Sequence, residues 1–174
     1  NRNLLVSNTR PLTLSIPYGN NLLEVLQREQ QLRKEIAELL QMYNLKLLLD
    51  TISGSIMLIK EVDEGSVLRI PYHQIADTLK RLIFFKAAVL SNKESVLLFE
   101  EPEAHMFPPY ISKFTADVMY DNNKNQFFIA THSPFVINDL MENLKSDELS
   151  IYVVGYKKES GETIVPVLDR KSVV

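Results

Sequence analysis

The stretch SVLLFEEPEAHMFP (Ser95–Pro108) decides the fold class. It begins with a continuous apolar run, Val96–Phe99, which is typical of a central parallel strand buried on both faces of a sheet. The run ends in two adjacent acids, Glu100 and Glu101, so both carboxylates are expected at the carboxyl end of a buried strand. In open α/β sheets this edge is where ligands bind.

The two neighbouring acids predict a metal-dependent site. Adjacent carboxylates repel each other, and their burial is costly unless the charge is compensated. Mg²⁺ suits this position because it prefers oxygen ligands and commonly keeps several waters. Because adjacent residues at a strand end point in different directions, one acid can hold the metal while the other polarises a water. The alternative is that Glu100 and Glu101 simply end a strand in solvent.

A second apolar run ends in polar side chains in FFIATHSP (Phe127–Pro134). The polar cluster is Thr131–Ser133, and Pro134 occupies a favoured early position of the next helix. A histidine at a strand end, here His132, can donate a hydrogen bond to a phosphate oxygen or a water, although a lone histidine is more often structural. One predicted helix, 109–120, separates the two strands, so they are expected to be parallel neighbours with converging polar ends.

The whole pattern predicts an α/β fold: a parallel sheet with flanking helices, preceded by a helix and a small antiparallel meander. Alternation at Leu12, Leu14 and Ile16 indicates a short strand or an ordered arm at the start. The expected helices are 21–43, 75–90, 109–120 and 134–144. The expected strands are 45–49, 52–60, 67–70, 96–99, 126–130, 151–156 and 163–167.

Two regions follow from this pattern. Residues 1–43 form an arm and a helix whose middle, QREQQLRKE, is almost wholly polar. Such a helix is either an amphipathic surface helix or the root of a coiled-coil hairpin. Residues 44–174 form the α/β part. The chain does not begin with Met, which indicates a piece of something longer.

Composition excludes some classes of function. The net charge of −3 and the pI near 5.7 give no bulk electrostatic reason for nucleic-acid binding. The chain has no cysteine, so disulfides and thiolate metal sites are excluded. No apolar run reaches the ~18 residues of a membrane span, and no secretory signal is visible. A cytoplasmic protein without a membrane partner is therefore expected.

Two motifs resemble those of a known family. Glu100–His105, followed by Pro108, resembles the extended Walker B motif and D-loop of ABC-type ATPases in the SMC-like and OLD-like (overcoming-lysogenization-defect) branch of the AAA proteins. Ala130–Pro134 resembles their switch-histidine loop. The resemblance extends over about 44–156. It implies the carboxyl-terminal lobe of an ABC-type ATPase head with the P-loop NTPase fold, using ATP and Mg²⁺.

The resemblance also implies roles for individual residues. Glu100 takes the position that holds Mg²⁺ through water, and Glu101 that of the catalytic glutamate that orients or deprotonates the attacking water. His132 takes the position that senses the γ-phosphate. Ala104–Phe107 take the D-loop, which runs along a dimer interface in the family. Phe107 departs from the pattern, because these proteins usually carry a polar histidine there.

The segment that should bind nucleotide across the dimer is altered. The family presents a Ser-x-Gly sequence at the start of the helix before Walker B, whereas this chain has Gln74–Thr78. Asp77 would face an anion there, which is unfavourable unless it caps the helix together with Thr78. The candidate nucleotide-binding residues are Asp77, Thr78, Thr131 and Ser133.

The phosphate-binding P-loop is not in this sequence. Its five glycines do not form Gly-x-x-x-x-Gly-Lys-(Ser/Thr). In the family that loop supplies most of the phosphate cradle and a lysine, and it lies in a lobe before the region seen here. The chain alone is therefore expected to bind ATP poorly.

Three functions are consistent with the sequence. The first is an ATP-hydrolysing head that forms a homodimer around nucleotide and acts on DNA or with an effector nuclease, in repair, chromosome maintenance or antiphage defence. The second is a degenerate module of the same fold, used for regulation or assembly. The third is a Toprim-type metal-dependent nuclease, which needs a further acidic cluster, and Asp117 and Asp121 fall on a predicted helix and its end instead.

Overall fold

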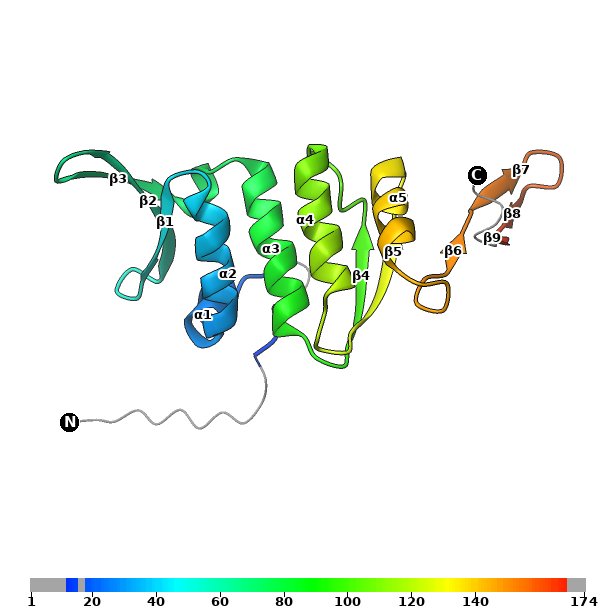
Figure 1. The fold of residues 1–174 in the computed structure, drawn as a ribbon, viewed down its shortest axis with the longest axis horizontal. Coiled ribbons are helices and arrows are strands. Elements are labelled where there is room, and N and C mark those ends of the chain that lie inside the picture. Colours follow the sequence, from blue (N-terminus) through cyan, green and yellow to red (C-terminus); the bar gives the residue numbers. More distant parts are fainter. Residues whose placement is uncertain (1–11, 16–17, 169–174) are drawn as a thin grey trace.

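Helices and strands follow one another along a long axis in the computed structural model, which describes residues 12–15 and 18–168 (Figure 1). Three helices stand side by side in the middle, with an antiparallel sheet at one end and small strand pairs at the other. The elements are α1 (Leu22–Arg28), α2 (Gln30–Gln41), β1 (Leu45–Asp50), β2 (Ser55–Asp63), β3 (Ser66–Pro71), the 3-10 turn η1 (Tyr72–Gln74), α3 (Asp77–Ser91), β4 (Val96–Glu100), α4 (Pro108–Met119), β5 (Gln126–Ala130), α5 (Pro134–Asn143), β6 (Ile151–Tyr152), β7 (Gly155–Lys157), β8 (Glu162–Ile164) and β9 (Val167–Leu168).

The first helical region is two helices, so the expectation of one helix over 21–43 is wrong at Glu29. This residue is extended, with φ −87° and ψ 95°. Arg33 stabilises the break, because its guanidinium donates to the carbonyls of Leu26 (2.6 Å) and Gln27 (2.7 Å) that α1 leaves free. The buried residues of α2 are Leu32, Ile36, Leu39 and Leu40. This apolar face makes α2 an amphipathic helix, while the coiled-coil interpretation stays a prediction.

The antiparallel meander forms as predicted, in the order β1-β2-β3. Its centre is Leu58, which is fully buried and lies opposite Leu47 and Ile70. Strand β2 begins later than predicted because the Asp50 carboxylate accepts hydrogen bonds from the backbone N–H groups of residues 52 and 53 and forms a turn there. Residues 12–15 form no strand, and Ile16 lies outside the described residues.

Strands β4 and β5 pair in parallel, with Val96 opposite Gln126 and Glu100 opposite Ala130. This pairing of neighbouring strands confirms the prediction for these two segments. One face of the pair packs on α3, α4 and α5 in a single apolar cluster. At its centre, the Phe99 ring lies 5.4 Å from that of Phe85 and 5.2 Å from that of Phe114. Such edge-on aromatic contacts fix the strand against the helices.

The other face of the β4–β5 pair is exposed. Leu98 is 77% exposed, Val96 55% and Phe128 52%. The expectation that Val96–Phe99 is buried on both faces is therefore wrong for the described chain. The reason is that α3, α4 and α5 all contribute to the same apolar cluster and so lie against the same face.

The last strands do not extend the parallel sheet. Strand β6 pairs with β9 and β7 with β8, both antiparallel, in pairs of two and three residues. Among the described residues neither segment pairs with β5, which corrects the expected strand–helix–strand–helix–strand sheet. Most of the large apolar side chains here are exposed: Tyr152, Val153, Val154, Tyr156, Ile164, Val165 and Val167.

One lysine joins three helices. The Lys86 ammonium of α3 lies 2.8 Å from a Glu35 carboxylate oxygen of α2 and 2.5 Å from one of Asp117 on α4. Its side chain is only 14% exposed. Burial lowers the pKa of Lys86, but the two carboxylates outweigh burial and raise it. The lysine is therefore charged, and its ion pairs with Glu35 and Asp117 link α3 to α2 and α4.

We expect Lys86→Met to destabilise the protein strongly, because it leaves two partly buried carboxylates without their cation. Breaking a buried ion pair from one side costs about 3 kcal/mol. The matched control is Lys34→Met, which removes a pair at 4.0 Å whose side chains are 70% and 63% exposed; it should cost less than about 0.5 kcal/mol. Urea unfolding measures both, and equal small losses would contradict the structural role of Lys86.

Candidate functional site

The two acids lie at the carboxyl end of β4, as predicted. Glu100 is the last residue of the strand, and Glu101 continues the ladder by donating its backbone N–H to the carbonyl of Ala130 at 2.8 Å. The chain then turns sharply, since Glu101 has a positive φ of 43°. This conformation costs a non-glycine residue on the order of 1 kcal/mol. Both side chains are exposed, so they are available to a ligand.

The structure brings Glu101 and His132 together. The His132 Nε2 atom lies 3.8 Å from Glu101 Oε1, across the two neighbouring strand ends. Their side chains are 91% and 56% exposed. This distance is too long for a hydrogen bond, and it leaves both groups free to contact a third group between or above them. The predicted convergence of the two motifs is confirmed.

Glu103 is a site residue that the sequence reasoning missed. Its Oε1 atom accepts hydrogen bonds from the Thr131 hydroxyl at 2.7 Å and from the His132 backbone N–H at 3.0 Å. The Thr131 hydroxyl oxygen also accepts from the Ser133 N–H at 3.0 Å. Thr131 and Ser133, expected to contact nucleotide, thus take part in shaping their own loop. The only sequence signal was that Glu103 follows Glu101 by two residues, because its partners lie 28 and 29 residues further along the chain.

The Glu103 carboxylate is held in its ionised form. Burial raises its pKa, but the hydrogen bonds from Thr131 and from backbone N–H groups outweigh burial and leave the pKa below its usual value. The second oxygen, Oε2, is shielded from solvent and has no hydrogen-bond partner among the described residues. The charge is therefore stabilised through Oε1 and its donors.

Helix α3 is tied to the same edge through backbone carbonyls. Arg81 donates from Nη2 to the Glu101 carbonyl at 3.1 Å, and its guanidinium lies 5.4 Å from the Phe85 ring centre. Thr78 donates its hydroxyl hydrogen to the His105 carbonyl at 2.7 Å. Thr78 thus binds the turn after Glu101, whereas Arg81 was not identified from the sequence. Both contacts fix the turn relative to α3.

The interpretation of Asp77 as a helix cap is wrong. The N-cap of α3 is Ala76, which is extended, so Asp77 is already helical and makes no capping bond. Its carboxylate pairs with the Lys80 ammonium at 2.6 Å and is 77% exposed. The hydrogen bond from Lys80 is the main cause of the lowered pKa of Asp77. The negative charge still suits the positive end of the helix dipole.

The turn after Glu101 is compact. The Ala104 N–H donates to the Glu101 carbonyl at 3.0 Å, and the Met106 N–H to the Glu103 carbonyl at 2.8 Å. The turn ends at Phe107, which precedes α4 and is 68% exposed. An apolar side chain is therefore exposed at the end of this turn.

The carboxylate oxygens at this edge are of the kind that binds Mg²⁺. Glu100 and Glu101 offer exposed carboxylate oxygens, and Mg²⁺ is commonly held by one or two carboxylates, waters and substrate phosphates. Among the described residues there is no group of three or more histidines, aspartates or glutamates that could form a complete cage. The fit to ATP is partial, because the sequence lacks the P-loop motif.

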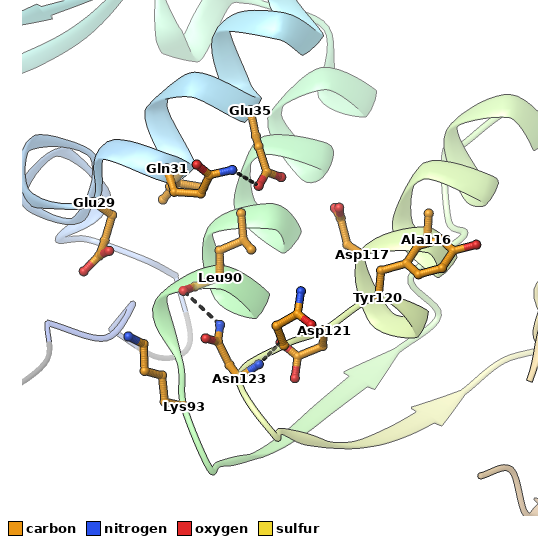
Figure 2. Close-up of a pocket in the computed structure, with 12 residues that line it drawn as sticks. Glu29, Gln31, Glu35, Leu90, Lys93, Ala116, Asp117, Tyr120, Asp121 and Asn123 are labelled. Carbon is orange, nitrogen blue, oxygen red and sulfur yellow. Dashed lines mark hydrogen bonds between the residues drawn. The ribbon is translucent and has the colours of Figure 1, made fainter.

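A hollow lies at the opposite edge of the sheet (Figure 2). It has a volume of about 590 Å³ between α2, α3, α4 and the loop before β5. Three of its acids have partners: Asp121 accepts from the backbone N–H groups of Asn123 and Asn125, and Lys86 binds Asp117 and Glu35. Asp117 and Asp121 line this hollow and do not join Glu100 and Glu101, so they do not supply the further acidic cluster that a Toprim-type nuclease needs.

Within the described ranges, no helix combines the length and apolar character that a membrane crossing requires.

Known proteins resemble this chain in sequence and in fold. Protein ea59 of Escherichia phage lambda is 32% identical over 91 residues, covering 46% of this chain and 17% of ea59, so this chain spans a small part of that relative. A structure from work on ATP-driven dimerization and DNA-stimulated activation of SMC ATPases aligns with a TM-score of 0.57 at 14% identity, over 86% of this chain and 91% of that one.

A second solved structure has a similar fold. The Smc head domain with an extended coiled coil, bound to the C-terminal domain of ScpA and derived from Pyrococcus furiosus, aligns with a TM-score of 0.55 at 15% identity. The alignment covers 81% of this chain and 35% of that one. These likenesses show that the chain has the α/β fold of an SMC ATPase head.

A family model matches residues 12–138, which include both motifs and the exposed site between them. The chain therefore belongs to the family described as "AAA domain, putative AbiEii toxin, Type IV TA system".

Proposed function

We propose that this chain is the part of an ATP-hydrolysing head that supplies the catalytic glutamate and the switch histidine. The observation that carries the proposal is the 3.8 Å approach of Glu101 and His132 at the carboxyl edge of β4 and β5. Membership of an AAA family and the SMC-head fold support the use of a nucleotide. The Walker B assignment, the position as a carboxyl-terminal lobe and the likeness to OLD-like proteins are parts of this proposal.

Each exposed side chain has a distinct task in the proposed reaction. The Glu101 carboxylate orients the attacking water and accepts its proton, and His132 donates a hydrogen bond to the terminal phosphate. Glu100 is the residue that would hold Mg²⁺, through water, at this edge. Mg²⁺, when bound, neutralises charge on the phosphate oxygens.

The phosphate cradle is proposed to come from a lobe outside this sequence. The exposed apolar face at Val96, Leu98 and Phe128 supports this, because parallel sheets are usually covered on both faces and a large exposed apolar patch commonly marks an interaction surface. A homodimer around nucleotide, DNA or an effector nuclease as partner, and a cytoplasmic location belong to the same proposal.

The second candidate is a degenerate module that no longer hydrolyses ATP. Two observations favour it: Gln74–Thr78 lacks the serine and glycine of the family, and Asp77 places an exposed carboxylate where a partner's phosphate would approach. The Thr78 hydroxyl is also already bound to the His105 carbonyl. The first experiment below separates the two candidates.

We expect Glu101→Gln in the intact protein to lower ATP turnover at least about 100-fold, because the amide cannot accept the proton of water. The dissociation constant for ATP should change by less than about threefold, since the carboxylate is proposed to act on water. Steady-state hydrolysis and equilibrium binding measure these, with the exposed α5 variant Glu142→Gln as the unchanged control. No ATP binding or no turnover by the parent establishes the degenerate module instead, whereas undiminished turnover in Glu101→Gln shows that Glu101 is not the catalytic glutamate.

A cysteine can test whether a lobe covers the sheet. The chain has no cysteine of its own, so Leu98→Cys and Lys34→Cys each introduce one thiol. The two native side chains are similarly exposed here, at 77% and 70%. In the intact protein, we expect maleimide to modify the thiol of the Leu98→Cys variant at least about tenfold more slowly than that of the Lys34→Cys variant, because burial blocks the reagent. Peptide mass spectrometry measures both rates, and equal rates would show that nothing covers this face.

A further inference from the structure

The loop that carries His132 has few means of holding its side chain in place. The His132 side chain is 91% exposed, so packing does not orient it. Its position relative to Glu101 therefore depends on the backbone of residues 131–133. That backbone begins where β5 ends, after Ala130 accepts the last ladder hydrogen bond from Glu101.

Beyond the end of β5, one carboxylate oxygen accepts two hydrogen bonds from the loop. Glu103 Oε1 accepts from the Thr131 hydroxyl at 2.7 Å and from the His132 N–H at 3.0 Å. The Glu103 carbonyl in turn accepts from Met106 N–H, which fixes Glu103 within the turn after Glu101. The acid thus connects the turn that sets Glu101 to the loop that sets His132.

We propose that Glu103 is a positioning residue that keeps the His132 side chain at the right position relative to Glu101 for the reaction proposed above. The inference rests on the proposed function for its purpose, but the connection itself is a property of this chain. Glu103 touches neither the reacting water nor the phosphate in this proposal. It acts through the loop backbone, which distinguishes it from Glu101 and His132.

The chemistry of the contact predicts which substitutions are tolerated. Both donors use the same oxygen, so an amide oxygen in Glu103→Gln can accept both hydrogen bonds. The amide nitrogen then replaces Oε2, which has no partner among the described residues. In Glu103→Ala both donors lose their acceptor. Thr131→Val removes one donor and keeps the side-chain volume.

We expect Glu103→Ala in the intact protein to lower kcat for ATP hydrolysis about tenfold or more, with KM changed less than about threefold, because orientation rather than binding is lost. Glu103→Gln should stay within about threefold of the parent in kcat, and Thr131→Val should lie between the two variants. Glu142→Gln, on the exposed side of α5, is the matched control for removing a carboxylate.

A second measurement needs no ATP. With histidine labelled with ¹³C at Cε1, a His132→Gln spectrum assigns the His132 signal by its loss. Glu103→Ala and Thr131→Val should shift or broaden that signal, and Glu103→Gln should leave it near its parent position. The signal of His73, in the 3-10 turn before α3, reports whether each variant is folded.

The two measurements separate the two proposals. An unmoved His132 signal in both Glu103→Ala and Thr131→Val overturns the positioning role, whatever the ATPase rates are. If Glu103→Gln lowers kcat and shifts the His132 signal as much as Glu103→Ala does, the argument that an amide oxygen can replace the carboxylate acceptor is wrong. If the parent hydrolyses no ATP while the His132 signal still moves in these two variants, the proposed function fails and the anchoring by Glu103 stands. If Glu103→Ala unfolds, the kcat and the His132 signal of Thr131→Val test the positioning role instead.

Discussion

The site depends on the parallel ladder between β4 and β5. This ladder runs without interruption from Val96 to Glu100 and is prolonged by the hydrogen bond from Glu101 N–H to the Ala130 carbonyl. Because parallel strands end at the same edge, the ladder brings a glutamate and a histidine that are 31 residues apart in sequence within 3.8 Å. A one-residue slip would turn Phe99 away from the helices and Glu101 away from His132, so packing and site geometry require the same register.

The same ladder explains which residues around the site are structural. Beyond the last strand residues, the backbone groups need other partners, since neither turn continues the sheet. Arg81 and Thr78 from α3 donate to the carbonyls of residues 101 and 105, and Glu103 accepts from the loop of His132. These contacts leave the side chains of Glu100, Glu101 and His132 exposed at a rigid edge. A site of this kind favours reactions in which position and charge matter more than enclosure.

The sequence predicted the elements that have strong local signals and missed those decided by tertiary contacts. Strand β5 and the meander follow apolar runs bounded by turn residues, so their prediction was close. The break at Glu29 was not predictable, because it depends on Arg33 reaching back to carbonyls of α1. The role of Glu103 was missed because its partners lie 28 and 29 residues further along the chain. Leu98 is exposed in the described chain, contrary to the prediction, because hydrophobicity indicates that a residue can be buried, not which neighbour covers it.

Charge gives the final constraint on how such a site can work. The edge carries Glu100, Glu101 and the ionised Glu103, and Asp77 lies at the start of α3. Lys80 pairs with the Asp77 carboxylate, and Arg81, which donates to the Glu101 carbonyl and keeps its charge, does not balance the three glutamates. A triphosphate would meet net repulsion here, and the helix dipole of α3 alone offsets less than one charge. ATP can therefore approach Glu101 and His132 only if Mg²⁺ and a cationic cradle accompany it, so the chemistry proposed for this chain requires a basic counterpart to complete the site.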